Sequence, residues 1–191
     1  MEELRSFLSW LLPRHAELGG LTEIRILGRG ARSGVWSAMV GPEDLDDLVE
    51  ALTPAGPPRD GIPAGDHPRS GEANIYFSLQ PVDPACWPRT GATLARVRRT
   101  TRDTDVRAYS TFVVDIDPER HPRGRSATDA EKDEARTVAK RVRGWFRDQG
   151  VETVIADSGN GFHLLVPLVP GFDDEIGQHA QDARTLLRWL D

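Results

Sequence analysis

The chain has 191 residues, which suits one domain with a smaller subdomain, and 38% of them are hydrophobic. It has no apolar run of the roughly 18 residues that a membrane span needs, and its single cysteine, Cys86, excludes a disulfide framework or a zinc–cysteine cluster. The net charge of −6 does not indicate a general nucleic-acid binder. Because the N-terminus also lacks a signal-peptide pattern, we predict a cytoplasmic protein.

The first part of the chain predicts an α/β arrangement. Apolar spacing predicts a helix over residues 2–12 that ends near Pro13, since proline disfavours a helix interior. Residues 21–40 are typical of two strands joined by a glycine-rich turn. A helical apolar stripe follows within residues 41–54, and the Pro, Gly and Asp content of residues 53–70 predicts a loop.

Arginines concentrate between residues 89 and 109, a stretch that follows a predicted strand over residues 73–82 and is expected to be mostly loop. It holds six arginines against two aspartates. Arginine can bind a phosphate with two hydrogen bonds, so this stretch is either a solvated loop or a phosphate contact. The candidates for contacts with nucleic-acid or nucleotide phosphates are Arg96, Arg98, Arg99, Arg102 and Arg107.

Two aspartates end the next strand, which is predicted over residues 109–118. Asp115 and Asp117 are two residues apart, so their side chains point to the same face of the strand. Neighbouring carboxylates repel each other unless a cation neutralises them, and oxygen ligands favour magnesium or manganese. The pair is therefore a candidate metal site for phosphoryl or nucleotidyl transfer, and the alternative is a solvated strand end.

A helix is predicted over residues 125–150, with Thr128 and Glu131 as a capping box and Gly150 at its end. Strands are predicted on either side of it, and a third strand over residues 162–168 follows after a short turn. This order predicts a β-α-β unit with a right-handed crossover and an antiparallel neighbour. The helix carries an apolar stripe of Ala135, Val138, Ala139, Val142, Trp145 and Phe146.

The turn before the last strand is rich in residues that tolerate positive φ angles, namely Ser158, Gly159, Asn160 and Gly161. Clustered backbone N–H groups in such turns bind anions, and His163 could donate to the same anion. If Phe162, Leu164 and Val166 pack under the helix, His163 lies on the open face of the sheet with the two aspartates. The alternatives are a plain β-hairpin and a half-buried strand histidine.

Taken together, "VVDIDP", the helix that opens "SATDAE", and "SGNGFHLLVPL" resemble the first two motifs of the archaeo-eukaryotic primase superfamily. Within it, the likeness is to primase-polymerases of plasmids, phages and mobile elements, and it covers residues 74–168. The resemblance implies an α+β fold with an RRM-like catalytic sheet over residues 73–191 and an N-terminal α/β subdomain over residues 1–72. It also implies template-directed nucleotidyl transfer from NTP or dNTP on single-stranded DNA, with a helicase or further C-terminal domain as a partner.

The resemblance also implies roles for individual residues. Asp115 and Asp117 would hold Mg²⁺ or Mn²⁺, and Ser158 and His163 would contact the triphosphate of the incoming nucleotide beside Gly159, Asn160 and Gly161. A third acidic ligand would lie on a strand after the next helix. Residues 176–190 have helical spacing but no such strand follows, so we expect a catalytic core truncated before the third acidic motif, or completed by a partner chain.

Three other functions stay open at this point. An inactive, primase-like module that binds single-stranded nucleic acid would have the fold without turnover. A rolling-circle nicking initiator would need a His-x-His pair, which the sequence lacks, and a nucleophilic tyrosine, whereas Tyr76 and Tyr109 lie in predicted strands. A general phosphate-binding α/β protein is the last alternative.

Overall fold

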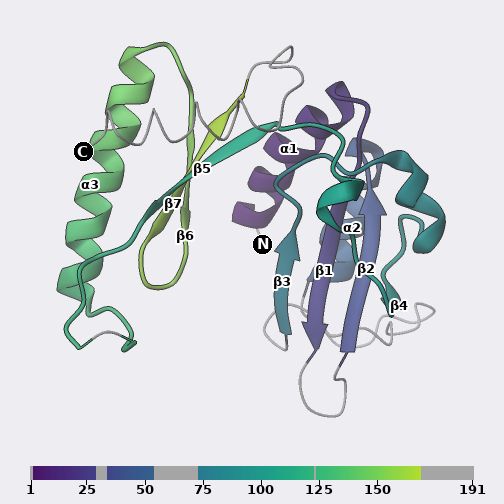
Figure 1. Cartoon of the computed structure of the whole chain (residues 1–191), viewed down its shortest axis with the longest axis horizontal. Helices are drawn as coiled ribbons and strands as arrows, with labels where there is room; N and C mark the ends of the chain where they lie inside the picture. The colour runs from purple at the N-terminus through teal and green to yellow at the C-terminus, as the bar shows by residue number, and fades with distance from the viewer. Residues whose placement is uncertain (1, 29–33, 54–72, 123, 169–191) are drawn as a thin grey trace. The chain divides into compact units, whose positions relative to one another are not determined.

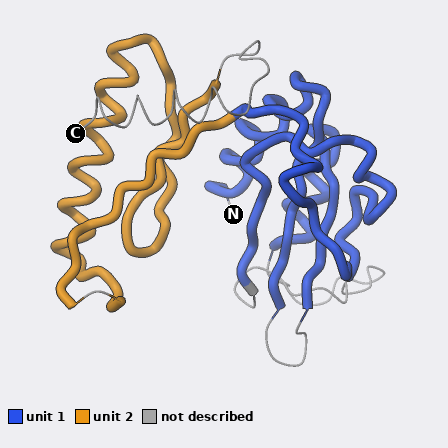
Figure 2. Tube along the Cα trace, in the orientation of Figure 1, with its two compact units in different colours: residues 1–110 blue, residues 111–191 orange. Residues whose placement is uncertain are grey.

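A computed structural model of the chain describes residues 2–28, 34–53, 73–122 and 124–168. The protein is a mixed α+β chain with two antiparallel sheets, and it divides into two compact units, residues 1–110 and 111–191 (Figure 2). The sequence placed the boundary after residue 72 instead. The difference arises because strand β3 (Ala73–Phe77) pairs with β1 (Thr22–Gly28), which puts β3 in the sheet of the first unit.

The first unit is built on a four-stranded sheet in the order β3-β1-β2-β4, with every neighbouring pair antiparallel (Figure 1). Its other strands are β2 (Gly34–Val40) and β4 (Ala95–Val97), and its helices are α1 (Glu2–Glu17), α2 (Leu45–Leu52) and the short 3₁₀ turns η2 (Pro42–Asp44), η3 (Pro84–Arg89) and η4 (Asp103–Asp105). One face of the sheet packs with α1 and α2 in a core that includes Leu8, Leu12, Ile24, Ile26, Trp36, Ala38, Val40, Leu48 and Leu52. The predicted strands and the predicted α2 helix are confirmed.

Helix α1 does not end near Pro13, so that prediction is wrong. The helix continues to Glu17 with Pro13 inside it, and Leu11, Leu12 and His15 are all buried around the proline. A proline in a helix interior costs roughly 3 kcal/mol. Burial of the large side chains in the last turns offsets this cost, and a local sequence rule for proline does not include it.

The second unit is a three-stranded antiparallel sheet in the order β5-β7-β6, with one long helix. Its elements are β5 (Thr111–Ile116), α3 (Asp129–Asp148), β6 (Val154–Asp157) and β7 (Phe162–Pro167). Strand β7 lies between β5 and β6 and pairs with both, so β5 and β6 run in the same direction without pairing directly. The predicted antiparallel neighbour is confirmed, and it separates the two strands that α3 connects.

Helix α3 begins as the sequence predicted. The Thr128 hydroxyl accepts a hydrogen bond from the Glu131 N–H, the Glu131 carboxylate accepts from the Thr128 N–H, and Gly150 follows the helix at φ +78°. Ala135, Ala139 and Phe146 of the predicted stripe are buried against the sheet. Val138 and Trp145 are 44% and 43% exposed, because they lie at the edge of that stripe on a helix that packs along one side only.

Several predictions fall outside the described residues. They are nearly all of the loop over residues 53–70, the glycine-rich turn between β1 and β2, the helical spacing over residues 176–190, and the missing third acidic ligand. Among the described helices, none combines the length and the apolar character that a bilayer span requires.

Candidate active site

The two faces of the second sheet differ in character, and this difference places the candidate residues. Val114 and Ile116 of β5 pack with Phe162 and Leu164 of β7 in the core beneath α3. Because side chains alternate along a strand, Asp115 and His163 point to the opposite face. This face is open at their end of the strands, whereas Thr111 and Leu165, further along on the same face, are buried. The predicted placement of these two residues on one open surface is confirmed.

Asp115 and His163 are also direct neighbours across the sheet. They occupy paired positions on β5 and β7, and His163 Nε2 lies 3.4 Å from Asp115 Oδ1. The side chain of Asp115 is 64% exposed and that of His163 is 42% exposed, so both can contact a ligand from solvent. Asp117 follows β5 by one residue, with a side chain that is 49% exposed.

Residues 158–161 form the turn of the β6–β7 hairpin, as the hairpin alternative predicted. Ser158 N–H donates to the Gly161 carbonyl at 3.0 Å, Gly159 N–H donates to Asp157 Oδ1 at 2.7 Å, and Gly161 N–H donates to Ser158 Oγ at 3.1 Å. Three backbone donors therefore serve the turn itself. The Ser158 hydroxyl accepts one of these bonds and still has its own proton to donate to a ligand.

The other two turn residues connect the hairpin to its surroundings. Asn160 Oδ1 accepts a hydrogen bond from the Ala127 N–H at 3.1 Å, which ties the turn to the start of α3. Gly161 lies against the end of β5, where an added Cβ would be 2.3 Å from the Ile116 carbonyl oxygen and 2.7 Å from Asp117 Oδ1. Only glycine fits this position, and its fit brings the turn beside Asp117.

Cations accompany the acids around the turn, and the sequence did not single them out. Arg120 Nη2 lies 3.2 Å from Asp117 Oδ2, and Lys132 Nζ lies 2.8 Å from Asp157 Oδ2. The Lys132 ammonium and the Gly159 N–H hold the pKa of Asp157 below its ordinary value. Asp157 is paired with Phe162, so it belongs to the face that α3 covers. The position of Asp157 directly before the glycine turn is the sequence signal that could have pointed to Asp157 and its partner Lys132.

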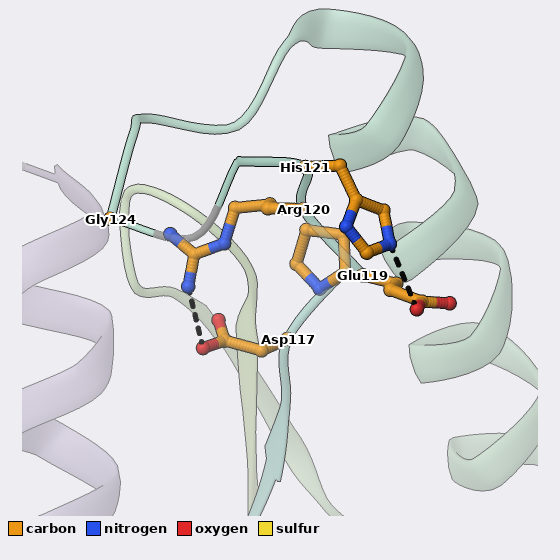
Figure 3. Close-up of a pocket in the computed structure, with 6 residues that line it drawn as sticks. Asp117, Glu119, Arg120, His121 and Gly124 are labelled. Atoms are coloured by element: carbon orange, nitrogen blue, oxygen red, sulfur yellow. Dashed lines mark hydrogen bonds and ion pairs between the residues drawn. The ribbon is translucent and has the colours of Figure 1, made fainter.

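A cavity of about 280 Å³ lies beside Asp117 in the loop that leaves β5 (Figure 3). In the close-up, the Arg120 guanidinium turns toward Asp117, and His121 turns away to pair with Glu119 at 3.0 Å. Gly124 completes the lining with Pro118. The cavity therefore has the second candidate aspartate in its wall and a cation in contact with it.

The candidate arginines all belong to the first unit, whereas the aspartates and His163 belong to the second. Arg107 Nε donates to the Leu18 carbonyl at 2.9 Å, and the Arg96 guanidinium lies 5.7 Å from the centre of the Trp36 ring. Arg102 precedes the η4 turn, and Arg98 and Arg99 are exposed after β4. Arg107 thus has a structural contact, and phosphate binding by this group stays a prediction.

The side chains around the two aspartates decide whether a divalent cation could bind there. Within the described ranges, no group of three or more His, Cys, Asp and Glu side chains could hold a metal ion. Mg²⁺, however, is often bound by one or two carboxylates together with substrate phosphates and water. Asp115 lies in β5 and Asp117 one residue beyond it, and their side chains are 64% and 49% exposed, so both carboxylates are accessible to a cation from solvent.

Comparison of the chain with protein-family models, with curated proteins and with solved structures returns no match.

Proposed function

We propose that the protein is a template-directed nucleotidyltransferase, a primase-polymerase of the archaeo-eukaryotic primase superfamily. The observation that carries this proposal is the pairing of Asp115 with His163 on the open face of the second sheet. The two motifs that resemble the superfamily are more than forty residues apart in the sequence, and the hairpin brings them side by side.

The topology of the second unit supports the same proposal. Strand β5, helix α3 and strand β6 form a split β-α-β unit with β7 between the strands, which is an arrangement that an RRM-like sheet would contain. We propose that the second unit is such a catalytic sheet. The open face without α3 is then the face that receives the nucleotide.

Each candidate residue has a chemical role in this proposal. His163 Nε2 and the Ser158 hydroxyl donate to phosphate oxygens of the incoming NTP or dNTP, and Gly161 keeps the turn close to Asp117. The 3′-hydroxyl of the primer strand or of an initiating nucleotide attacks the α-phosphorus, the bond to the β-phosphate oxygen breaks, and pyrophosphate leaves. No side-chain nucleophile is needed, since positioning and charge neutralisation supply most of the rate.

Asp115 and Asp117 are the residues that would hold Mg²⁺ or Mn²⁺, which when bound would neutralise charge on the phosphates. Arg120 already contacts Asp117 and so shields one of the two carboxylates. Binding of a cation to the pair would release this ion pair, and the guanidinium would then be available to a phosphate.

Extension of a primed single-stranded template with labelled nucleotides and Mn²⁺ tests this function. We expect product from the wild-type chain and about a hundredfold less, or lower still, from Asp115→Asn, which keeps the shape of the side chain and removes its charge. Asp148→Asn, at the exposed end of α3, is the matched control and should extend like the wild type. Equal product from Asp115→Asn and the wild type would contradict the proposal.

A second candidate is an inactive primase-like module that binds single-stranded nucleic acid. It is favoured by the lack of a three-residue metal-ligating group within the described part of the chain. The two candidates differ in the same assay, because the module would bind the template without forming product.

A further inference from the structure

The second face of the first sheet is covered over only part of its length. Met39, Val82 and Cys86 form a small core on this face, and Ser37 and Glu23 are buried next to it. Further along the strands, Leu27 is paired with Val35 on one side and Asn74 on the other, and Val35 is paired with Val97. Leu27 and Tyr76 are 38% and 47% exposed there.

An arginine marks the border between the covered and the open part. Arg25 is paired with Tyr76 across the sheet, so the two side chains share the open face. Its guanidinium is held by Glu23 and by the Thr101 carbonyl, the latter at 3.0 Å, and the side chain stays 33% exposed. Burial acts to raise the pKa of Glu23, but hydrogen bonds from Arg25, Thr101 and Ser37 outweigh it and keep the pKa low.

The open part therefore combines three features on one face of the sheet. Tyr76 presents an aromatic ring whose hydroxyl accepts a hydrogen bond from the Asn74 amide at 3.2 Å. Leu27 adds an exposed apolar side chain between β2 and β3. Arg98 and Arg99 are exposed directly after Val97, where β4 leaves the sheet.

We propose that this surface, formed by Leu27, Asn74, Tyr76 and Val97 with Arg25, Arg98 and Arg99 at its border, is a stacking platform for single-stranded nucleic acid. Bases stack on the Tyr76 ring and lie against Leu27, and the arginines contact the phosphates. Aromatic rings on an open sheet face beside cations are the general means by which proteins bind unpaired strands. The platform rests on the proposed function and extends it, because the first unit would then bind the template strand.

The charges on the platform favour single-stranded nucleic acid over a second protein as its ligand. Among the described strand residues of this face the acid is Glu23, whose side chain is 1% exposed and paired with Arg25, so the exposed charges on the platform residues are positive. A stable protein interface covers about 800 Å² on each partner and is depleted of charge at its centre. One tyrosine and one leucine beside exposed arginines therefore suit a single nucleic-acid strand, with its stacked bases and negative backbone, better than they suit a protein interface.

The test is the affinity for 5′-labelled dT20 and U20, measured by fluorescence anisotropy in EDTA without nucleotide. Stacking on one aromatic ring contributes enough that we expect Tyr76→Ala to weaken binding about tenfold, whereas Tyr76→Phe keeps the ring and stays within about twofold. Leu27→Glu should weaken binding and Leu27→Lys should not, because only the first repels the backbone. Trp145→Ala removes an aromatic side chain of similar exposure from the second unit and should bind like the wild type.

Two results would overturn the platform. One is wild-type affinity of both Tyr76→Ala and Leu27→Glu for both oligonucleotides, with thermal melts that show folded protein. The other is a dimer in sedimentation that Tyr76→Ala dissociates, because this face would then bind a second copy of the chain. The wild-type chain separates the two proposals: if it forms no extension product while its binding still depends on Tyr76, the platform stands and the polymerase proposal is lost.

Discussion

His163 and Asp115 lie opposite each other on β7 and β5, with Nε2 and Oδ1 3.4 Å apart on the sheet face away from α3. The pairing gives each side chain a distinct expected effect when it is changed. His163→Ala should raise the KM for nucleotide about tenfold or more, because it removes a donor to the triphosphate. Asp115→Asn should instead lower kcat about a hundredfold or more, as loss of charge stabilisation does in other active sites. Steady-state extension kinetics separate the two effects, and equal losses of kcat in both variants would contradict the assigned roles.

Gly161 should tolerate no side chain. In Gly161→Ala the new Cβ would be 2.3 Å from the Ile116 carbonyl oxygen, so β5 and the turn must separate and Asp117 must move. We expect a lower melting temperature and a loss of extension activity. Gly144→Ala is the matched control, since Gly144 lies inside α3 with open space around it and alanine there should stabilise the protein by about 0.5–1 kcal/mol. Thermal melts of the two variants that shift in the same direction would contradict this account.

Asn160 should act through the fold and not through the nucleotide. Its Oδ1 accepts from the Ala127 N–H, so Asn160→Ala should cost about 1 kcal/mol of unfolding free energy. Asn160→Asp keeps the acceptor and should restore that stability in urea denaturation. If the aspartate variant is as unstable as the alanine variant, this hydrogen bond does not hold the turn. If it is stable but binds nucleotide far more weakly than Asn160→Ala does, the added charge lies beside the phosphates.

His15 should make the protein less stable in mild acid. Burial lowers the pKa of His15 to about 4, and its Nε2 donates to the Leu79 carbonyl while Nδ1 accepts from the Thr22 hydroxyl, which is the neutral ring. The unfolded chain binds this proton near its ordinary value of about 6.5, so the unfolded state holds more protons between pH 6.5 and 4 and stability falls as the pH is lowered through this window. The full effect is roughly 3 kcal/mol.

The control for this prediction is His15→Gln, which cannot take up a proton in that range. The difference in unfolding free energy between wild type and His15→Gln should shrink from pH 7 to pH 4.5. A difference that stays constant over this range would show that His15 is not the titrating group.

The sequence was sufficient to predict structure where a local pattern determines the position of a side chain or the start of a helix. Strand alternation alone placed Asp115 and His163 on the open face, and the Thr128–Glu131 capping box located the start of α3. Both depend on residues close together in the chain. The order β5-β7-β6 makes Asp115 and His163 neighbours, and it depends on the hairpin folding back between the two strands.

The sequence was insufficient where long-range packing decides. Pro13 stays helical because Leu11, Leu12 and His15 are buried by the rest of the unit, and no local rule includes that burial. The strand at β3 was assigned to the catalytic part by its position near the motifs, but its hydrogen bonds go to β1. Arg120 and Lys132 were overlooked because their partners, Asp117 and Asp157, are recognisable only once the turn is formed.

The most direct measurement of the central claim is a crystal structure with Mn²⁺ and a non-hydrolysable nucleotide, with anomalous scattering used to locate the metal. We predict a manganese peak within about 2.5 Å of carboxylate oxygens of both Asp115 and Asp117, and triphosphate oxygens within hydrogen-bond distance of His163 Nε2 and Ser158 Oγ. A nucleotide bound elsewhere, or manganese that leaves these two carboxylates without a metal, would contradict the account.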